Sequence, residues 1–340
     1  MRNNKNLNVL VVRLSALGDV AMSVPAIYSV AETYPTNTFH VVTSKLCAQL
    51  FVGAPANVMV HPLEAVTLGN LFRCVRSLKV DVVADLHNVL RTWIMDIYFR
   101  LWGKTVAMLD KRRWERGAVK TAHYATPVNF TDRYFDVFKR LKLPCMFFFT
   151  NLSADDLPEL PDGLPAKNGK KWVGIAPFAR YTNKVYPLEK MQKVADMMAA
   201  HPETEVFLFG GRKEKEIMEK WCGRSARLHN MAGRFTLGEE LALMARLDVM
   251  LTMDSANMHL ASLVGTRVAS IWGSTSPACG FLGWRQDSSD AILASCDCQP
   301  CTIAGSNNCR FGDMHCLTDI SPETVADKLK QILASEEPAS

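Results

Sequence analysis

The segment from Asp254 to Ala261 combines residue types that suit the binding of a phosphate group. It follows an apolar run, residues 249–253, that is typical of a buried strand, and apolar residues recur after it at near-helical spacing. A second apolar run at residues 267–271 predicts a strand–helix–strand unit. In such a unit the N–H groups that begin the helix face the end of the first strand and can bind phosphate. The same residues would also serve as a plain helix cap, and spacing alone does not separate the two interpretations.

A second group of candidate residues follows the first apolar run, residues 8–12. Ser15, Gly18 and Asp19 stand where this strand passes into a helical segment that extends toward Tyr34. Glycine permits a sharp turn, and a carboxylate at the C-terminal end of a strand can point into the ligand cleft of a doubly wound fold. Asp19 would also be favourable simply as an acidic residue beside the positive end of the helix dipole.

The two segments together resemble one enzyme family. Asp-Ser-x-x-x-His-x-Ala from Asp254, followed by Gly-Thr and by Gly-Ser-Thr-Ser-Pro, is similar to the signature of the family 9 glycosyltransferases, the ADP-heptose:lipopolysaccharide heptosyltransferases. Arg-Leu-Ser-x-Leu-Gly-Asp from Arg13, followed by Pro-Ala, resembles the opening motif of the same family. Ala256 stands where the family usually has glycine, and Ala179 and Arg180 stand where it often has serine or threonine.

The resemblance implies a role for each candidate. Asp19 would be the general base, and Lys184, in a Lys-x-aromatic-Pro segment, would reach the donor diphosphate. Glu214 would bind the nucleotide ribose through its acceptor oxygens, and Met231 would lie beside the adenine. The implied donor-binding residues are Lys184, Arg180, Glu214, Met231, Asp254, Ser255, Ala256 and His259.

A basic run at residues 111–116 follows the fifth expected strand. Such a run is either a solvated face or a clamp for an acceptor that carries phosphates and sugar carboxylates, which suit arginine. The implied acceptor-binding residues are Ser15, Gly18, Lys111, Arg112, Arg113 and Arg116. Because the basicity is local and no nucleic-acid motif is present, nucleic acid is not an expected partner.

The implied reaction moves a heptose from ADP-heptose to a sugar hydroxyl of the lipopolysaccharide inner core, with inversion. Another nucleotide-sugar as donor is the alternative within the same class. No cofactor is expected, and no catalytic metal is expected because the chain lacks an Asp-x-Asp metal site. The acceptor is lipid-linked, so basic and aromatic residues of the first domain would contact the inner leaflet of the membrane.

The elements that must position these residues alternate between strand and helix, which predicts an α/β fold with parallel sheets. The resemblance implies two Rossmann-like domains facing a cleft, the GT-B glycosyltransferase architecture. We expect an acceptor-binding domain at residues 1–155 and a nucleotide-sugar-binding domain at 172–320, separated by a stretch rich in Pro, Asp, Gly and Lys. A terminal helix at residues 321–335 is expected to pack back on the first domain.

The bulk composition excludes some classes and leaves one alternative open. The net charge of +5 is mild, and neither a transmembrane run nor a signal peptide is visible, so a cytoplasmic protein is expected. A nicotinamide oxidoreductase should have a glycine-rich fingerprint after its first strand, and residues 14–19 do not form one. The cysteines at positions 296, 298, 301, 309 and 316 have a spacing that could hold zinc or an iron–sulfur cluster, which keeps a metal or redox protein as the alternative from another class.

Overall fold

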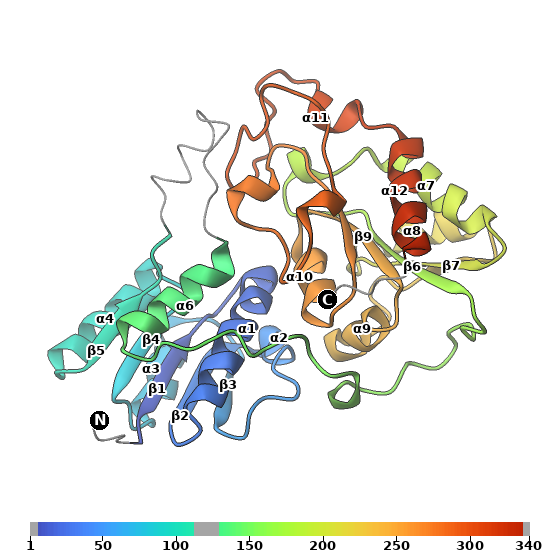
Figure 1. Ribbon diagram of the computed structural model, residues 1–340. Coiled ribbons are helices and arrows are strands. Elements are labelled where there is room, and N and C mark those ends of the chain that lie inside the picture. Colours follow the sequence, from blue (N-terminus) through green and yellow to red (C-terminus); the bar gives the residue numbers. More distant parts are fainter. Residues whose placement is uncertain (1–5, 112–128, 336–340) are drawn as a thin grey trace. The chain divides into compact units, whose positions relative to one another are not determined.

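The computed structural model describes residues 6–111 and 129–335 (Figure 1). These residues fall into two compact units, one made of residues 6–111 and 129–152 and the other of residues 153–335. The chain passes from one unit to the other after Leu152, at the start of the stretch rich in Pro and Asp. Each unit is built around one parallel β-sheet.

The first unit contains a five-stranded sheet in the order β3-β2-β1-β4-β5. Apolar residues fill its strands, and the side chains of β1 from Val9 to Val12 are fully buried. The strands are β1 (Asn8–Val12), β2 (Thr38–Ser44), β3 (Val58–Leu63), β4 (Val82–Asp85) and β5 (Thr105–Met108). The helices are α1 (Leu17–Thr33), α2 (Lys45–Ala48), α3 (Leu68–Arg76), α4 (Leu90–Leu101) and α6 (Phe130–Arg140).

This strand order places a topological switch point between β1 and β4, which pair in parallel with Val12 opposite Asp85. The chain leaves β1 toward one side of the sheet and leaves β4 toward the other, so the loops after the two strands diverge. Ligands of open α/β sheets bind in the crevice that this divergence creates at the carboxyl ends of the strands. The topology therefore directs attention to the residues that follow Val12 and Asp85.

The second unit contains a six-stranded sheet in the order β11-β10-β9-β6-β7-β8, again parallel throughout. Its strands are β6 (Lys171–Ala176), β7 (Thr204–Leu208), β8 (Leu228–Asn230), β9 (Val249–Met253), β10 (Val268–Ile271) and β11 (Ala291–Ile292). Its α-helices are α7 (Leu188–Ala200), α8 (Lys215–Cys222), α9 (Leu237–Met244), α10 (Ala256–Leu263), α11 (His315–Thr318) and α12 (Pro322–Ala334). Four short 3-10 turns complete the described elements: η1 (Ala154–Asp156), η2 (Thr182–Lys184), η3 (Pro277–Cys279) and η4 (Ser288–Asp290). The switch point of this sheet lies between β6 and β9, so the loops after these two strands occupy the ligand-binding position.

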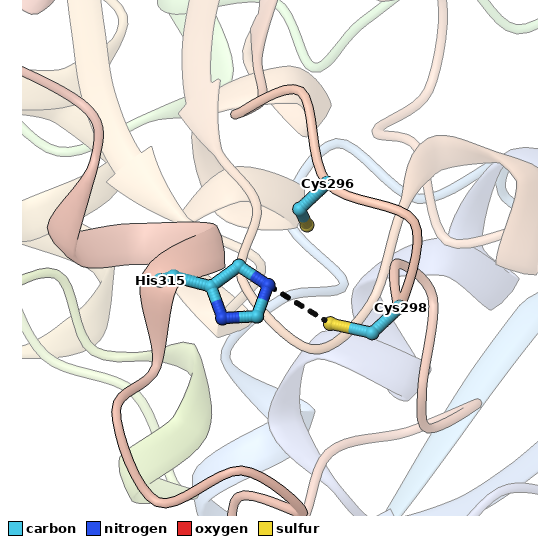
Figure 2. Close-up of side chains that lie close together, drawn as sticks. All are labelled: Cys296, Cys298 and His315. Carbon is cyan, nitrogen blue, oxygen red and sulfur yellow. Dashed lines mark hydrogen bonds between the residues drawn. The ribbon is translucent and has the colours of Figure 1, made fainter.

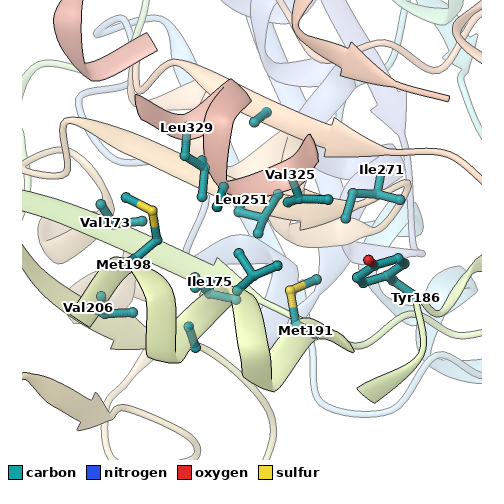
Figure 3. Close-up of a cluster of buried hydrophobic side chains, with 14 of the residues drawn as sticks. Val173, Ile175, Tyr186, Met191, Met198, Val206, Leu251, Ile271, Val325 and Leu329 are labelled. Carbon is teal, nitrogen blue, oxygen red and sulfur yellow. The ribbon is translucent and has the colours of Figure 1, made fainter. Parts of the chain in front are cut away.

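The core of the second unit explains where the terminal helix goes. Figure 3 shows Met191 and Met198 of α7 together with Val325 and Leu329 of α12 in one buried cluster that includes Leu251 of β9. Ser321 caps α12 by accepting a hydrogen bond from the Thr324 amide at 3.0 Å, and Pro322 occupies its first turn. The sequence predicted that this helix packs back on the first domain. Within the second unit the helix packs on α7 and β9, where its apolar face completes the core.

Candidate functional site

Asp19 lies in the first turn of α1, just beyond the carboxyl end of β1. Its Oδ2 atom lies 2.7 Å from Nη2 of Arg13 and accepts a hydrogen bond from the Ala16 amide at 3.3 Å. Both interactions use Oδ2, and within the described part of the chain Oδ1 has no hydrogen-bond partner. Asp19 is therefore held in position by one oxygen while the other can accept a proton.

Arg13 is the residue that fixes this arrangement, and the sequence motif assigned it no role. Its side chain is buried, and its second guanidinium nitrogen, Nη1, donates to the Leu86 carbonyl at 2.6 Å, just after β4. The guanidinium also lies 5.7 Å from the ring centroid of Tyr134, whose hydroxyl donates to the Asp19 carbonyl at 3.2 Å. One cation thus links the ends of β1 and β4 to α6.

His87 lies beside this group, directly after β4, and its backbone N–H donates to Asp85 Oδ1 at 2.8 Å. Burial and the neighbouring cations Arg13 and Lys111 lower the pKa of His87 to about 4. The imidazole is consequently neutral near pH 7, so it adds no positive charge beside Arg13.

The expected acceptor residues occupy different environments. Ser15 is exposed and Gly18 is buried in the first turn of α1. Lys111 donates from Nζ to the Asn88 carbonyl at 2.8 Å, and its own carbonyl accepts from Arg133 at 3.0 Å. The remaining three, Arg112, Arg113 and Arg116, lie outside the described residues.

Lys184 and Asp254 form a buried ion pair at the switch point of the second sheet. Lys184 ends the 3-10 turn η2 after β6, Asp254 follows β9, and the Nζ and Oδ2 atoms lie 2.6 Å apart. Their side chains are 9% and 5% exposed, and Thr275 Oγ1 donates to the same Oδ2 at 2.6 Å. Two residues that the sequence placed in the donor site, 70 positions apart, are therefore in direct contact.

Ser255, Ala256 and His259 belong to the start of α10. Ser255 is the N-cap residue, and its hydroxyl hydrogen-bonds that of Thr252 at 3.1 Å. Ala256 is the first helical residue and is not among the described residues with positive φ, so alanine carries no backbone strain in the place of the usual glycine. His259 is buried one turn further along. The free N–H groups of this helix begin beside Asp254 and favour an anion there.

Glu214 and Met231 lie at the carboxyl ends of the neighbouring strands β7 and β8. The Met231 amide donates to Leu208 at 2.9 Å, and the Gly233 amide donates to Gly210 at 3.1 Å. A Cβ atom at Gly211 would lie 2.8 Å from Oε2 of Glu214, so this glycine allows the carboxylate to rest on the backbone. The backbone bonds thus place the segment that contains Met231 against the loop that leads to Glu214.

Arg180 differs from the other donor candidates. It is exposed on the loop after β6, and its guanidinium carbon lies 5.5 Å from the ring centroid of Tyr181. An exposed cation on the loop that leads to η2 could meet an anionic ligand without first breaking a buried contact.

The comparisons with known proteins identify the family. Residues 135–310, more than half of the chain, match the model of glycosyltransferase family 9 (heptosyltransferase). The chain belongs to glycosyltransferase family 9. It is 22% identical over 329 residues to lipooligosaccharide heptosyltransferase 2 of Campylobacter jejuni, covering 93% of this chain and 96% of the relative. It is 26% identical to lipopolysaccharide heptosyltransferase 1 of Pseudomonas aeruginosa, covering 97% of this chain and 99% of the relative.

The fold of this family 9 glycosyltransferase is similar to that of solved relatives. The structure of E. coli ADP-heptose lps heptosyltransferase II matches with a TM-score of 0.70 and 19% sequence identity, covering 96% of this chain and 98% of that one. The expected GT-B architecture of two Rossmann-like α/β domains is confirmed. The sequence left more than one protein class open. Because the chain belongs to family 9, it is a glycosyltransferase.

Arg13, Tyr134 and Thr275, which contact Asp19 or Asp254, were not predicted as site residues from the sequence of this glycosyltransferase. Arg13 and Thr275 stand inside the motifs that carried the family resemblance, so position within the motif was an available signal. Tyr134 lies in α6, remote from either motif, and no spacing rule connects it to Asp19.

Proposed function

We propose that this family 9 glycosyltransferase transfers a heptose from ADP-heptose to a sugar hydroxyl of the lipopolysaccharide inner core, with inversion. The relatives that it matches along nearly their whole length are named for heptose transfer to lipopolysaccharide or lipooligosaccharide. The observation that carries the proposal is the buried Lys184–Asp254 pair beside the N-terminus of α10. This arrangement supplies a cation, helix N–H groups and a sugar-binding carboxylate at one ligand-binding edge.

The donor half of the reaction uses the second unit. Lys184 and the first N–H groups of α10 stabilise the negative charge that develops on the diphosphate as the bond to the anomeric carbon breaks. Asp254 accepts hydrogen bonds from sugar hydroxyls, while Glu214 and Met231 bind the ribose and adenine of the nucleotide. Arg180 meets the diphosphate from the exposed loop, and His259, buried in α10, supports the start of that helix.

The acceptor half of the reaction uses the first unit. Oδ1 of Asp19 takes the proton of the attacking hydroxyl, the hydroxyl oxygen forms the new bond to the anomeric carbon, and ADP leaves with the electrons of the broken bond. A general base of this kind accelerates a reaction by roughly 100- to 10,000-fold. The cations of the acceptor site bind phosphate and carboxylate groups of the acceptor. The proposed acceptor-binding residues are Ser15, Gly18, Lys111, Arg112, Arg113 and Arg116.

The acceptor is lipid-linked, so we also propose peripheral contact with the inner leaflet of the membrane, through α4. Helix α4, at the edge of the first unit in Figure 1, has an exposed apolar face. The exposed residues follow a helical period along it: Leu90, Trp93, Ile94, Ile97 and Leu101. No helix among the described residues is long and apolar enough to span a bilayer.

The charges on α4 fit the same surface. Its acidic residue, Asp96, is buried, while Arg100 is exposed and Arg91 is partly exposed. An exposed stripe of Trp, Ile and Leu flanked by arginine matches the helices that lie in the interface of anionic membranes. This face supports a protein that works at the cytoplasmic surface of the membrane where its acceptor resides.

The test of the proposed function compares two variants with ADP-heptose and a lipopolysaccharide core acceptor. Asp19→Asn is expected to keep the wild-type Kd for ADP while kcat falls by about 100-fold or more. Lys184→Met is expected to lose donor affinity by about tenfold or more, since a charge-assisted contact contributes about 1.5–3 kcal/mol. Glu64→Gln, an exposed carboxylate of the first unit with 76% side-chain exposure, is the matched control. Turnover of Asp19→Asn at the rate of the control would remove Asp19 from the mechanism.

A further inference from the structure

Five cysteines gather in a part of the second unit that has little regular structure. Residues 293–314 contain neither α-helix nor β-strand, yet they hold Cys296, Cys298, Cys301 and Cys309, and Cys316 follows in α11. All five are free thiols. The transfer reaction proposed above uses none of them, so their concentration in one irregular segment needs a separate explanation.

Three potential metal ligands converge within this segment. The Sγ atoms of Cys296 and Cys298 and a ring nitrogen of His315 all lie within 4.8 Å of one another. Figure 2 shows the two cysteines on one loop and His315 entering from α11, with Cys298 Sγ 3.5 Å from His315 Nε2. Thiolate sulfur and imidazole nitrogen are the ligands that zinc and similar transition metals prefer.

The orientation of His315 is a second, independent observation. Its Nδ1 atom lies 3.0 Å from Oδ1 of Asp313; in the tautomer with the proton on Nδ1, this N–H donates a hydrogen bond to the carboxylate and the Nε2 lone pair faces Cys298. The Asp313 carboxylate also accepts from the His315 backbone amide at 3.3 Å. Metal-binding histidines usually donate their second ring N–H to a carboxylate in this way, because the bond fixes the tautomer and the ring orientation.

A hollow in this part of the second unit is lined by Cys298 and His315. Three further thiols line the same hollow: Cys301, Cys309 and Cys316. A structural zinc site takes four ligands, so one of these three thiols suffices to complete a set with Cys296, Cys298 and His315. The hollow is also lined by Asn183 and Ser274, which directly precede Lys184 and Thr275 in the sequence.

Several hydrogen bonds fasten the segment to the rest of the unit, and Ala294 and Cys296 pack against its hydrophobic core. The amides of Cys301 and Thr302 both donate to the Ser274 carbonyl at 3.0 Å, and Gln299 donates to the carbonyls of Trp272 and Gly273 at 2.8 Å. A long irregular segment loses much chain entropy on ordering, and a metal clip that closes it would offset part of that cost.

We propose that Cys296, Cys298 and His315, with a fourth thiol from the same hollow, bind one divalent transition-metal ion of the zinc type. Binding releases the protons of the coordinating thiols and closes the irregular segment onto α11. The ion has a structural role: it fastens the segment that packs on Asn183 and Ser274, and it takes no part in bond making.

The test measures metal in the full chain purified under reducing conditions without added chelator. We expect about one zinc-type ion per chain by elemental analysis, and its loss in Cys298→Ser and in His315→Ala. Cys222→Ser, which changes a cysteine of α8 in the same unit, is the matched control and should keep the metal. Removing the ion with a chelator should lower the melting temperature, and added Zn2+ should restore it.

A second measurement on the unaltered sequence guards against variants that do not fold. The metal-free wild-type chain is titrated with Co2+, and the proposal requires the intense visible bands of tetrahedral cobalt bound to thiolate. Absence of both native metal and this cobalt spectrum would overturn the proposal. A disulfide between Cys296 and Cys298 in the protein purified without oxidant would overturn it as well, because those sulfurs could not then bind an ion.

Discussion

The Nζ atom of Lys184 lies 2.6 Å from Oδ2 of Asp254, and both side chains are almost completely buried. Thr275 donates to the same carboxylate oxygen, so the lysine, the carboxylate and the hydroxyl form one connected group. In the proposed function, little side-chain entropy of the lysine remains to be lost on diphosphate binding, because its partner already fixes the side chain.

Breaking this ion pair should destabilise the second unit more than breaking a surface pair. Asp254→Asn leaves a buried ammonium without its counter-charge, and we expect a loss of about 3–5 kcal/mol in the free energy of unfolding. The double variant Lys184→Met/Asp254→Asn should recover part of that loss, since neither buried charge remains. Denaturant unfolding of the single and double variants measures both effects.

The exposed pair of Arg224 and Asp196, 3.0 Å apart, provides the control. Arg224→Ala should cost no more than about 1 kcal/mol, because solvent screens an exposed pair. If the double variant lost as much free energy of unfolding as the two single variants at Lys184 and Asp254 added together, the two residues would not be energetically coupled.

Arg13 should act as a positioning residue for Asp19. Its guanidinium joins the Leu86 carbonyl and the Asp19 carboxylate through two separate nitrogens, at 2.6 and 2.7 Å, which a single ammonium cannot reproduce. We expect Arg13→Lys to lower kcat by about 10- to 100-fold, as expected when a catalytic group is misplaced by about 1 Å. The donor Kd should stay at the wild-type value.

Steady-state kinetics and ADP titration of Arg13→Lys separate these effects. Arg73→Lys, an exposed arginine of α3, should behave like the wild type in both measurements. Weakened ADP binding by Arg13→Lys with an unchanged kcat would argue against a positioning role toward Asp19.

The apolar face of α4 should carry the membrane contact. Ile97 and Leu101 are 58% and 82% exposed, and their insertion into a bilayer interface would remove this apolar surface from water. We expect Ile97→Asp/Leu101→Asp to lower affinity for vesicles that contain anionic phospholipid by at least about tenfold, or 1.4 kcal/mol. Vesicle co-sedimentation measures the change.

Leu46→Asp is the control for this surface, because Leu46 is 54% exposed but lies in α2. Its vesicle binding should match that of the wild type. Turnover of a lipid-free acceptor should be unaffected in all variants, so a general loss of activity would point to misfolding rather than to membrane contact.

Asp96 should make the stability of the first unit depend on pH. Burial and the neighbouring Asp85 raise its pKa to about 8, above the unfolded value of about 3.9. Between these two values the folded chain holds a proton that the unfolded chain has released. This group's contribution to stability is therefore complete below the unfolded pKa and declines as pH rises toward the folded pKa, by at most about 1.4 kcal/mol per pH unit.

Asp96→Asn should remove this dependence, because an amide is neutral throughout and can donate to Asp85. We expect the variant to melt several degrees above the wild type at pH 8, at about 2–4 °C per kcal/mol, and close to it at pH 5. Differential scanning calorimetry at the two pH values makes the comparison. Parallel curves for wild type and variant would show that Asp96 does not carry the pH dependence.

The local pattern of the sequence was sufficient to predict the two sheets, whereas the candidate residues came from the resemblance to the family. Buried strands are short apolar runs, and the turns that follow them contain the glycines and polar residues of the two motifs. Asp19, Lys184 and Asp254 became candidates because the segments in which they stand resemble the motifs of family 9. The packing of α12 on α7 and β9 was not predicted, because the apolar face of an amphipathic helix shows that it will be covered but not by which elements.

Only the tertiary structure decided which distant residues touch. Arg13 meets Asp19 while holding the carbonyl of Leu86, and Thr275 meets Asp254, because the strand orders bring β1 beside β4 and β9 beside β10. Cysteine spacing likewise gave no sign that His315 completes a set with Cys296 and Cys298. Periodicity records which face of an element is apolar, whereas side-chain pairing depends on the order in which strands assemble, and that order is a property of the whole chain.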